Sequence, residues 1–432
     1  MKHSDPKKRF RRSDPASAML SATMVFFFAG FLMLAVKDGS WQSFLLCLVV
    51  PAIIFISTAL IPKLFPADKL LLSLTNFLCA LSVLVRYYID PKRGLDQAVF
   101  YGMGVGAMLL CILLVRYVRH WGKLILALMG AGLLFLALPL LYGHAINGAT
   151  NWVKIGSIQF QPSEITKLSL VVSLAYLLSR RRDLIAVAFS LACLGMLILQ
   201  ADLGTAMVYY GVAVLMLYTR TGKLTTLAVC AAVPLAALAA AYFVLPALGI
   251  TKFADKFQYV SSRFSVWQDP WKDPDKAGYQ LIMGLIAIAN GGLWGVGLGL
   301  GNADTSIPYA YNDFIYPVIL HEFGAVFGVI VLMMYLFIII RAIMIARRSR
   351  TVFHALLAVG CAALIGLQTF VIVGGNIKLI PLTGVTLPFI SSGGTSLVSS
   401  LCVMGLLQGV ASVNEAGVRE DRALAMQGGR AP

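Results

Sequence analysis

The sequence predicts an all-α polytopic integral membrane protein with about twelve transmembrane helices and both ends in the cytoplasm. Hydrophobic residues fill 59% of the chain and charged residues only 12%, whereas an ordinary soluble domain is about one quarter charged. Apolar stretches long enough to cross a bilayer recur along the whole sequence. Lys and Arg gather in alternate connections between these stretches, as the loops of a membrane protein require.

Twelve stretches of spanning length make up the predicted bundle. Their ranges are 19–36, 43–62, 69–88, 97–115, 124–142, 164–179, 184–200, 203–219, 224–248, 314–340, 353–375 and 387–412. A further apolar segment, 278–301, is dense in glycine, and we interpret it as a re-entrant or surface-lying element. Its glycines do not match the dinucleotide fingerprint, and they favour close packing against another backbone.

The distribution of positive charge orients the bundle. With the N-terminus inside, 23 of the 35 Lys and Arg residues fall in inside loops, where such residues are enriched in membrane proteins. One span more or fewer would put Arg180–Arg182 and Arg341–Arg350 on opposite sides of the membrane. The charge pattern therefore supports an even number of spans.

This topology divides the chain into regions. They are a basic cytoplasmic tail (1–18), N-terminal helices (19–142), a core (143–412) and a second cytoplasmic tail (413–432). Two long segments, 143–163 and 249–312, lie outside in this scheme. Loops longer than about fifteen residues are uncommon in compact structures and are usually functional.

The sequence lacks features that several other functions would require. Cytoplasmic loops account for the net charge of +16, and no basic stripe interleaves with stacking aromatics outside the spans, so nucleic acid is not an expected partner. The sequence contains no Walker loop and no HExxH motif. His321 and Glu322 are adjacent, and adjacent helix positions point about 100° apart, so we expect no protein-built metal site.

Polar residues at membrane depth are the first candidates for function, because a central charge costs about 2.5–3.5 kcal/mol on insertion scales. Ser163 can cap the helix that follows it. Glu164 and Lys167 stand three residues apart on one helical face and can pair. Gln161–Glu164 with Lys167 therefore forms either a cap and an ion pair that stabilise a helix start, or a substrate contact.

Two acidic residues lie at the outer ends of predicted spans. Asp202 belongs to Gln200–Thr205, which is either a tight helix break or a functional turn. Asp313 is either a cap for the following helix or a catalytic group. Unlike the other acids of the loop 249–312, it is pressed against an apolar run at the membrane face. Desolvation there would raise the pKa of its carboxyl and make it a better proton acceptor.

The segment Asn376–Ser396 combines two prolines, small hydroxyl residues and a Gly-Gly pair. Proline interrupts a helix, so this segment cannot be one continuous helix. Non-helical backbone at membrane depth must be buried in protein or line a cavity. The pattern leaves a simple loop and a cavity lining equally open.

These groups, in this order, resemble the SEDS family, the shape, elongation, division and sporulation proteins. The strongest match is Pro381–Ser396, which is similar to the family signature P-x-x-G followed by a run ending in S-[YSA]-G-G-[STN]-[SA]. Further similar pieces are Trp152, Gln161–Glu164 with Lys167, Gln200–Thr205, Arg263 with Trp267, Gly278–Gln280, Gly291–Gly292, Asn312–Phe314, Glu322 and Gly324. The family core usually has ten spans, so the resemblance implies two extra N-terminal helices here.

The resemblance implies a peptidoglycan glycosyltransferase that polymerises lipid II outside the bacterial cytoplasmic membrane, for cell elongation, division or sporulation. The 4-hydroxyl of one sugar attacks C1 of the next while the diphosphate leaves, which needs a base at the hydroxyl and positive charge or a metal at the diphosphate. By resemblance, Asp313 is the expected catalytic base. The expected substrate-binding residues are Trp152, Lys154, Glu164, Lys167, Asp202, Arg263, Glu322, Ser391 and Ser392.

The resemblance also implies partners, namely lipid II, membrane lipids and a class B penicillin-binding protein with transpeptidase activity. A divalent cation, Mg²⁺ or Mn²⁺, is compatible with the diphosphate chemistry, although no ligand set in the sequence demands one. The alternatives are a lipid II flippase and a non-catalytic scaffold of a cell-wall synthase. The polar groups gather in the outer half of the predicted bundle, whereas a flippase needs a polar path through the whole bilayer, and this difference favours the enzyme.

Overall fold

The structure, a computed structural model, describes residues 15–118, 120–146, 149–156, 158–239, 262–276, 278–301, 307–308, 310, 312–391 and 393–428. In this part of the chain, each predicted span overlaps one helix. These helices are α1 (Pro15–Asp38), α2 (Trp41–Leu64), α3 (Lys69–Ile89), α4 (Pro91–Tyr117), α5 (Trp121–Tyr142), α6 (Pro162–Ser179), α7 (Asp183–Leu199), α8 (Leu203–Thr221), α9 (Leu224–Ala239), α14 (Ile315–Arg347), α15 (Val352–Asn376) and α16 (Gly394–Gly428). The all-helical membrane fold is thus confirmed.

Eight helices of the described chain, α1 to α5 and α14 to α16, are long and apolar enough to cross a membrane. Helices α6 to α9 are shorter or more polar; α6, α7 and α8 pack against α5 or α15, and α9 packs against α8. Large apolar side chains such as Leu126, Leu134 and Leu141 of α5 are exposed. Lipid tails rather than water are the natural neighbours of such side chains.

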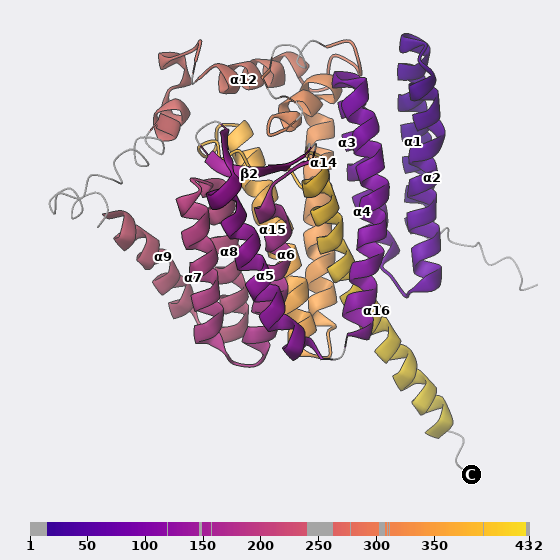
Figure 1. The fold of residues 1–432 in the computed structure, drawn as a ribbon. Coiled ribbons are helices and arrows are strands. Elements are labelled where there is room, and N and C mark those ends of the chain that lie inside the picture. The colour runs from indigo at the N-terminus through magenta and orange to yellow at the C-terminus, as the bar shows by residue number, and fades with distance from the viewer. Residues whose placement is uncertain are drawn as a thin grey trace, which may run out of the picture.

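The helices run roughly side by side, and α3, α15 and α16 form the interior of the bundle (Figure 1). The most apolar part of α3 is 94% buried, whereas the corresponding part of α5 is only 22% buried. Helix α5 therefore faces the lipid along much of its length, and α3 is surrounded by protein.

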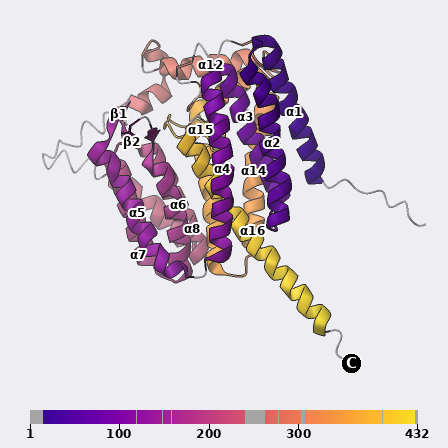
Figure 2. The ribbon, with the colours of Figure 1, turned by 45° about the vertical axis from the view of Figure 1, so that its right-hand side comes forward.

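Helices α1 and α2 form a hairpin at one edge of the bundle, where they pack against each other and against α3 (Figure 2). A buried polar cluster joins this hairpin to the rest. The Asn76 amide of α3 donates to Ser57 Oγ at 2.8 Å and to Thr58 Oγ1 at 2.7 Å. The Tyr101 hydroxyl of α4 donates back to Asn76 Oδ1 at 2.7 Å.

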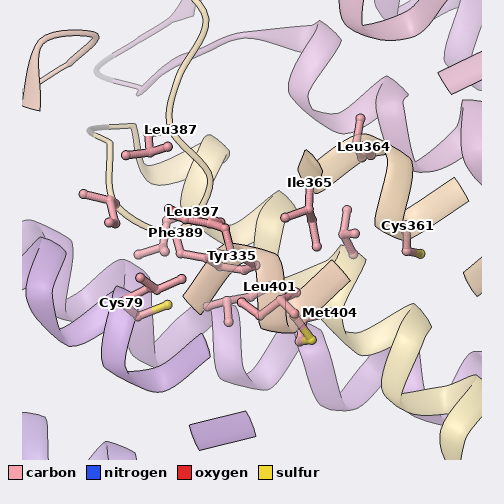
Figure 3. Packing of buried hydrophobic residues seen from close by; sticks show 14 of the residues in the cluster. Cys79, Tyr335, Cys361, Leu364, Ile365, Leu387, Phe389, Leu397, Leu401 and Met404 are labelled. Carbon is pink, nitrogen blue, oxygen red and sulfur yellow. The ribbon is translucent and has the colours of Figure 1, made fainter. Parts of the chain in front are cut away.

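The interior is close-packed around Tyr335 of α14, which lies among Cys79, Phe389, Leu397 and Leu401 (Figure 3). Although Tyr335 is fully buried, its hydroxyl donates a hydrogen bond to the Pro388 carbonyl. A buried tyrosine hydroxyl normally needs such a partner. This contact fixes the broken segment before α16 to the centre of the bundle.

The last predicted span, 387–412, begins too early. Helix α16 starts at Gly394, because residues before it adopt conformations that a helix excludes: Phe389 has φ 67° and Gly393 has φ 136°. Leu387, Phe389 and Ile390 are nevertheless buried, so hydropathy counts them with the helix. At its other end α16 continues to Gly428, through most of the predicted tail 413–432.

A small sheet interrupts the otherwise helical fold within the predicted outer segment 143–163. Strands β1 (His144–Ile146), β2 (Ala149–Ile155) and β3 (Ile158–Phe160) pair antiparallel in the order β1-β2-β3. The sequence analysis did not predict these strands, because two of them have only three residues. Their ladders give the backbone of a connection at the end of the bundle its hydrogen-bond partners.

The glycine-rich segment 278–301 forms the short helix α12 (Tyr279–Gly291) and a chain of turns, and α12 lies across the end of the bundle (Figure 1). The turns pair with a break in α14 at Gly324, where φ is 82°. Gly297 N donates to the Glu322 carbonyl at 3.0 Å, and Ala325 N donates to the Gly292 carbonyl at 2.9 Å. The expected close packing of glycines against another backbone is confirmed.

Candidate active site

Asp313 lies in the turn that leads into α14, at the end of the bundle that α12 covers. The helix takes Phe314 as its cap residue and has no side-chain cap bond, so the structure does not use Asp313 as the helix cap. The half-buried carboxylate instead faces the broken segment before α16. A Cβ atom placed on Gly384 would lie 3.9 Å from Asp313 Oδ2, so that backbone passes directly beside the carboxylate.

Beside this turn, the short helix 262–268 contacts the segment 378–382 through two hydrogen bonds. Arg263 Nη1 donates to the Leu382 carbonyl at 2.6 Å, and Trp267 Nε1 donates to the Lys378 carbonyl at 3.1 Å. These two bonds hold the helix in register with the loop. They place a guanidinium close enough to Asp313 to interact with its charge.

The acidity of Asp313 reflects opposing influences. Burial raises the pKa of its carboxyl above the ordinary value, and it outweighs the Arg263 charge and a hydrogen bond from the Gln280 side chain, which act to lower it. The same Gln280 amide nitrogen also donates to the Pro308 carbonyl at 2.9 Å. The result is a carboxylate with more affinity for a proton than an exposed aspartate, as the sequence analysis expected.

A cavity of about 160 Å³ opens beside Arg263. The start of α8, the helix 262–268 and the loop before α16 form its walls, and Gly204, Met207 and Thr383 are among the lining residues. Gly204 is required there, since a Cβ at this position would lie 2.6 Å from the Thr383 carbonyl oxygen. Arg263 is the one charged residue among these lining residues, and the other walls are mostly apolar.

Glu164 and Lys167 form the predicted ion pair in α6, with Lys167 Nζ 2.5 Å from Glu164 Oε2, and both side chains are buried. The pair also reaches the broken segment. Ser399 Oγ donates to Glu164 Oε2 at 3.0 Å, and Thr386 Oγ1 donates to Glu164 Oε1 at 3.3 Å. Lys167 Nζ further donates to Gln368 Oε1 at 3.4 Å. These contacts tie α6 to α15, α16 and the loop between them.

The predicted cap of α6 is wrong. The helix begins at Pro162, so Ser163 lies within its first turn and is not the cap residue. The cap residue is Gln161, and neither Gln161 nor Ser163 makes a side-chain cap bond. Proline is favoured at the first helical position because its ring already has helical φ and the missing N–H would be unbonded there. The Ser163 carbonyl instead accepts a bond from the Tyr209 hydroxyl at 2.6 Å.

Asp202 has the geometry of a helix break. Its Oδ1 accepts from Thr205 N at 3.2 Å and caps α8, after Ala201 has turned the chain at φ 59°. Its Oδ2 accepts from Asn151 of β2 and Gln161, each at 3.0 Å. Asp202 thereby connects the sheet, α6 and α8, which supports the structural interpretation of this group.

Glu322 contacts the glycine-rich turns. Its Oε2 accepts from Gly299 N at 2.8 Å, next to the break in α14. Lys37 of the N-terminal hairpin donates to the Gly299 carbonyl, and the Tyr88 hydroxyl of α3 donates to the Gly301 carbonyl at 2.8 Å. Glu322 therefore holds a segment that covers the end of the bundle.

The remaining predicted site residues are distributed unevenly. Trp152 and Lys154 lie on β2, where Lys154 is exposed and pairs with Gln159. Among the described residues, no contact joins Lys154 to Asp313. Ser391 is buried and its Oγ accepts from Leu387 N at 2.7 Å, so it shapes the loop, and Ser392 lies outside the described residues.

Sequence reasoning missed several side chains that shape the site, namely Gln280, Gln368, Thr386 and Ser399. Gln280 belongs to the similar piece Gly278–Gln280, and Thr386 lies within the signature segment, so both had a signal. Ser399 and Gln368 sit in apolar helices, where a polar side chain within a span is itself a reason to expect a buried partner.

No group of three or more His, Cys, Asp or Glu that could hold a metal lies together in the described part of the chain. Asp313 supplies one carboxylate at the site. Mg²⁺ is usually held by one or two carboxylates together with substrate phosphates. The residues present are compatible with an ion that arrives with a diphosphate.

Comparisons with known proteins agree with this arrangement. A family model for the FtsW, RodA and SpoVE proteins, described as cell cycle protein, matches residues 70–416. The peptidoglycan glycosyltransferase RodA of Mycobacterium tuberculosis (strain ATCC 25618 / H37Rv) is 30% identical over 335 residues, which cover 72% of this chain and 69% of that protein. The probable peptidoglycan glycosyltransferase FtsW of Bacillus subtilis (strain 168) is 36% identical over 282 residues, 62% of this chain and 68% of that protein.

A solved structure described as "Structural coordination of polymerization and crosslinking by a peptidoglycan synthase complex" contains a similar chain, at 29% identity and a TM-score of 0.64. The match covers 81% of this chain and 98% of that chain. The family model begins after α1 and α2, so the match leaves the N-terminal hairpin outside the shared core. From the match over residues 70–416 and these relatives, the chain belongs to the SEDS family of FtsW, RodA and SpoVE proteins.

Proposed function

We propose that this protein polymerises lipid II into glycan strands, with Asp313 as the catalytic base. The protein is a peptidoglycan glycosyltransferase, as its family and the names of its relatives indicate. The observation that carries the assignment of the base is the position of Asp313. It is a half-buried carboxylate with a raised pKa at the end of a membrane-embedded bundle, close enough to Arg263 to interact with its charge. The Gly384 backbone passes beside it, and the adjacent Thr383 lines the cavity next to Arg263.

The proposed chemistry uses two groups of this chain. Asp313 accepts the proton of the sugar 4-hydroxyl as that oxygen attacks C1 of the neighbouring sugar, and burial makes it a stronger acceptor. The Arg263 guanidinium can stabilise the negative charge of the leaving diphosphate. A Mg²⁺ or Mn²⁺ ion that arrives with the diphosphate would supply further positive charge.

Arg263 is better suited to the diphosphate than the two lysines that the sequence suggested. Lys167 is buried and already neutralised by Glu164, so an anion would compete with that carboxylate. Lys154 is exposed on β2, away from the contacts that Asp313 makes. We therefore assign the diphosphate to Arg263 and treat Glu164, Lys167 and Asp202 as residues that position the surrounding helices.

Polymerisation of labelled lipid II by the purified full-length protein tests this function. The assay is run alone and with a class B penicillin-binding protein, the proposed partner, because one structural relative was solved as part of a peptidoglycan synthase complex. We expect glycan chains longer than the disaccharide, with more product in the presence of the partner. Transfer of lipid II across vesicle membranes without any polymer would instead identify a flippase. If the protein showed neither activity, a non-catalytic scaffold would be the remaining function.

The proposed orientation places Asp313 at the outer face of the bacterial cytoplasmic membrane and both termini inside. Single cysteines at exposed Lys272, near the site, and at exposed Lys223, in the α8–α9 connection, test it after the seven native cysteines are replaced. We expect an impermeant thiol reagent to label position 272 but not position 223 in intact cells. The reverse pattern would overturn the orientation.

A further inference from the structure

A cavity of about 760 Å³ lies at the end of the bundle opposite to Asp313. Four helix ends meet there: the end of α4, the start of α5, the end of α6 and the start of α15. Helix α14 starts beside Asp313 and ends just before α15 begins. The continuous part of α14, from its break at Gly324 to Arg347, spans about 35 Å at about 1.5 Å per residue. This length exceeds the hydrocarbon core of about 30 Å, so the cavity and the proposed catalytic site face opposite leaflets.

The lining of this cavity is cationic. Arg116, Lys123 and Arg180 contribute three positive charges, and no Asp or Glu is among the lining residues. A second cavity at the same end, about 440 Å³, differs because Asp68 and Glu415 line it together with its arginines, and Arg341 pairs with Asp68. Those carboxylates would repel an anion, whereas the charged residues that line the 760 Å³ cavity are all cations and would attract one.

Two of the three cations are held in place. Arg116 Nη1 donates to Ser412 Oγ at 2.8 Å, and its guanidinium lies 5.7 Å from the centre of the Phe65 ring. The Arg180 guanidinium lies 5.8 Å from the centre of the Tyr176 ring. Stacking of this kind orients a guanidinium without neutralising its charge. None of the three cations forms an ion pair within the described chain.

The start of α5 adds to the positive potential. Its cap residue, His120, makes no side-chain cap bond, and Gly122 and Lys123 of the first turn line the cavity. By contrast, the neighbouring α15 is capped by Thr351 Oγ1, which accepts from His354 N at 3.2 Å. The first N–H groups of a helix and its dipole favour a bound anion.

The rest of the lining combines aromatic and apolar residues with the polar residues His120, Ser179, Thr351 and His354. Trp121, Tyr176 and Phe353 pack together, with ring centres 5.3 Å apart for Trp121 and Phe353 and 6.3 Å apart for Tyr176 and Phe353. Aromatic side chains are enriched where a membrane protein meets the lipid headgroups. A volume of this size falls in the range of about 300–1,000 Å³ for organic ligands and exceeds the need of a lone phosphate ion.

We infer that this cavity binds the phosphate headgroup of an anionic membrane lipid, from the leaflet opposite to Asp313. The phosphate lies between Arg116, Lys123 and Arg180 at the start of α5, and the acyl chains extend along the apolar helix surfaces. Basic pockets between transmembrane helices are suited to such headgroups. The ligand chemistry, a phosphate ester, is shared with soluble phosphates, and the aromatic wall favours the lipid as its source.

Native mass spectrometry of the detergent-purified full-length protein tests the inference by counting retained lipid at increasing concentrations of added cardiolipin. The test variant is Lys123→Gln with Arg180→Gln, because both residues are exposed, whereas Arg116 also bonds to α16. The control variant is Arg348→Gln with Arg419→Gln, which removes two charges from the second cavity. Phosphatidylcholine and inorganic phosphate serve as the other ligands.

We expect one cardiolipin to bind the unaltered protein and the control alike, and the test variant to bind about 10- to 30-fold more weakly. The reason is that each Lys or Arg near an anionic surface contributes about a fivefold factor. Lys123→Gln alone should give an intermediate loss, and phosphatidylcholine should bind weakly throughout. Equal cardiolipin binding by the test variant would overturn the site. Full competition by millimolar inorganic phosphate would overturn the lipid as its occupant.

Discussion

Two pairs of opposite charges lie toward the same end of the bundle. Their differences distinguish a pair that stabilises the fold from a pair that is available for catalysis. Glu164 and Lys167 come from one helix, are buried, and have further partners on three other segments. Asp313 and Arg263 come from separate segments, a cavity opens beside Arg263, and Asp313 is only half-buried. A charge that the protein itself satisfies holds helices together, whereas a cation that lines a cavity and a partly exposed carboxylate remain available to a substrate.

The largest expected effect comes from Asp313→Asn. The substitution keeps the size of the side chain and removes the proton acceptor, so lipid II polymerisation should fall by about 10²- to 10⁴-fold, the usual contribution of general-base catalysis. Expression and thermal unfolding should change little, because the structure does not use Asp313 as a helix cap.

The matched control is Asp269→Asn. Asp269 is an exposed aspartate at the same end of the protein, and it caps the short helix η2 (Pro270–Lys272) by accepting from Trp271 N at 3.1 Å. Asparagine caps about as well as aspartate, so this variant should polymerise normally. Equal activity in the two variants would remove the catalytic assignment of Asp313.

The second expected effect is on stability. Glu164→Lys or Lys167→Glu places two like charges in a buried site, and breaking a buried pair costs about 3–5 kcal/mol. The double reversal should recover part of the loss in unfolding temperature and in polymerisation. Recovery should be incomplete, because Ser399 and Thr386 donate to Glu164 and would face a lysine. A double variant no better than the worse single would show that the pairing is not the source of the effect.

Arg263→Gln should shift the pH dependence of polymerisation. The Arg263 charge lowers the pKa of Asp313, so its removal raises that pKa. A base acts only when deprotonated, and the rate falls as the pH drops through its pKa. The acid limb of the profile should therefore move to higher pH in Arg263→Gln and stay in place in Arg263→Lys. If the acid limb of the pH profile did not move in Arg263→Gln, the Arg263 charge would not influence the pKa of the catalytic base.

The smallest expected effect is that of Gly384→Ala. The backbone there has φ 70°, a left-handed conformation that costs a residue with a Cβ about 1–2 kcal/mol. The added methyl group would meet only Asp313 Oδ2, at an ordinary contact distance of 3.9 Å. Unfolding temperature should fall slightly and activity severalfold. A loss as large as that of Asp313→Asn would mean that the loop, and not the carboxylate, limits the reaction.

Regular elements were predictable because membrane spans and close helical pairs are local properties. Hydropathy alone located every spanning helix, and the spacing of Glu164 and Lys167 was enough to predict their contact. The start of α16 was not predictable in this way. Phe389 and Ile390 are as apolar and as buried as helical residues, yet φ of 67° at Phe389 excludes a helix.

The contacts of the proposed catalytic site were beyond sequence reasoning. Asp313 could be selected by its position at an apolar boundary, and Arg263 by resemblance. Their proximity depends on the bonds from Arg263 to Leu382 and from Trp267 to Lys378, which join segments far apart in the chain. Gln280 reaches Asp313 from α12 for the same reason.

The polar cluster that joins the N-terminal hairpin to α3 makes the rest of the bundle depend on α2. Without α2, the Asn76 amide would lose Ser57 and Thr58 and would face hydrocarbon, where an unsatisfied polar group costs several kcal/mol. A truncated protein that lacks the hairpin would therefore need an apolar residue at position 76 to keep its stability. The hairpin thus has a structural role, whether or not it takes part in the reaction.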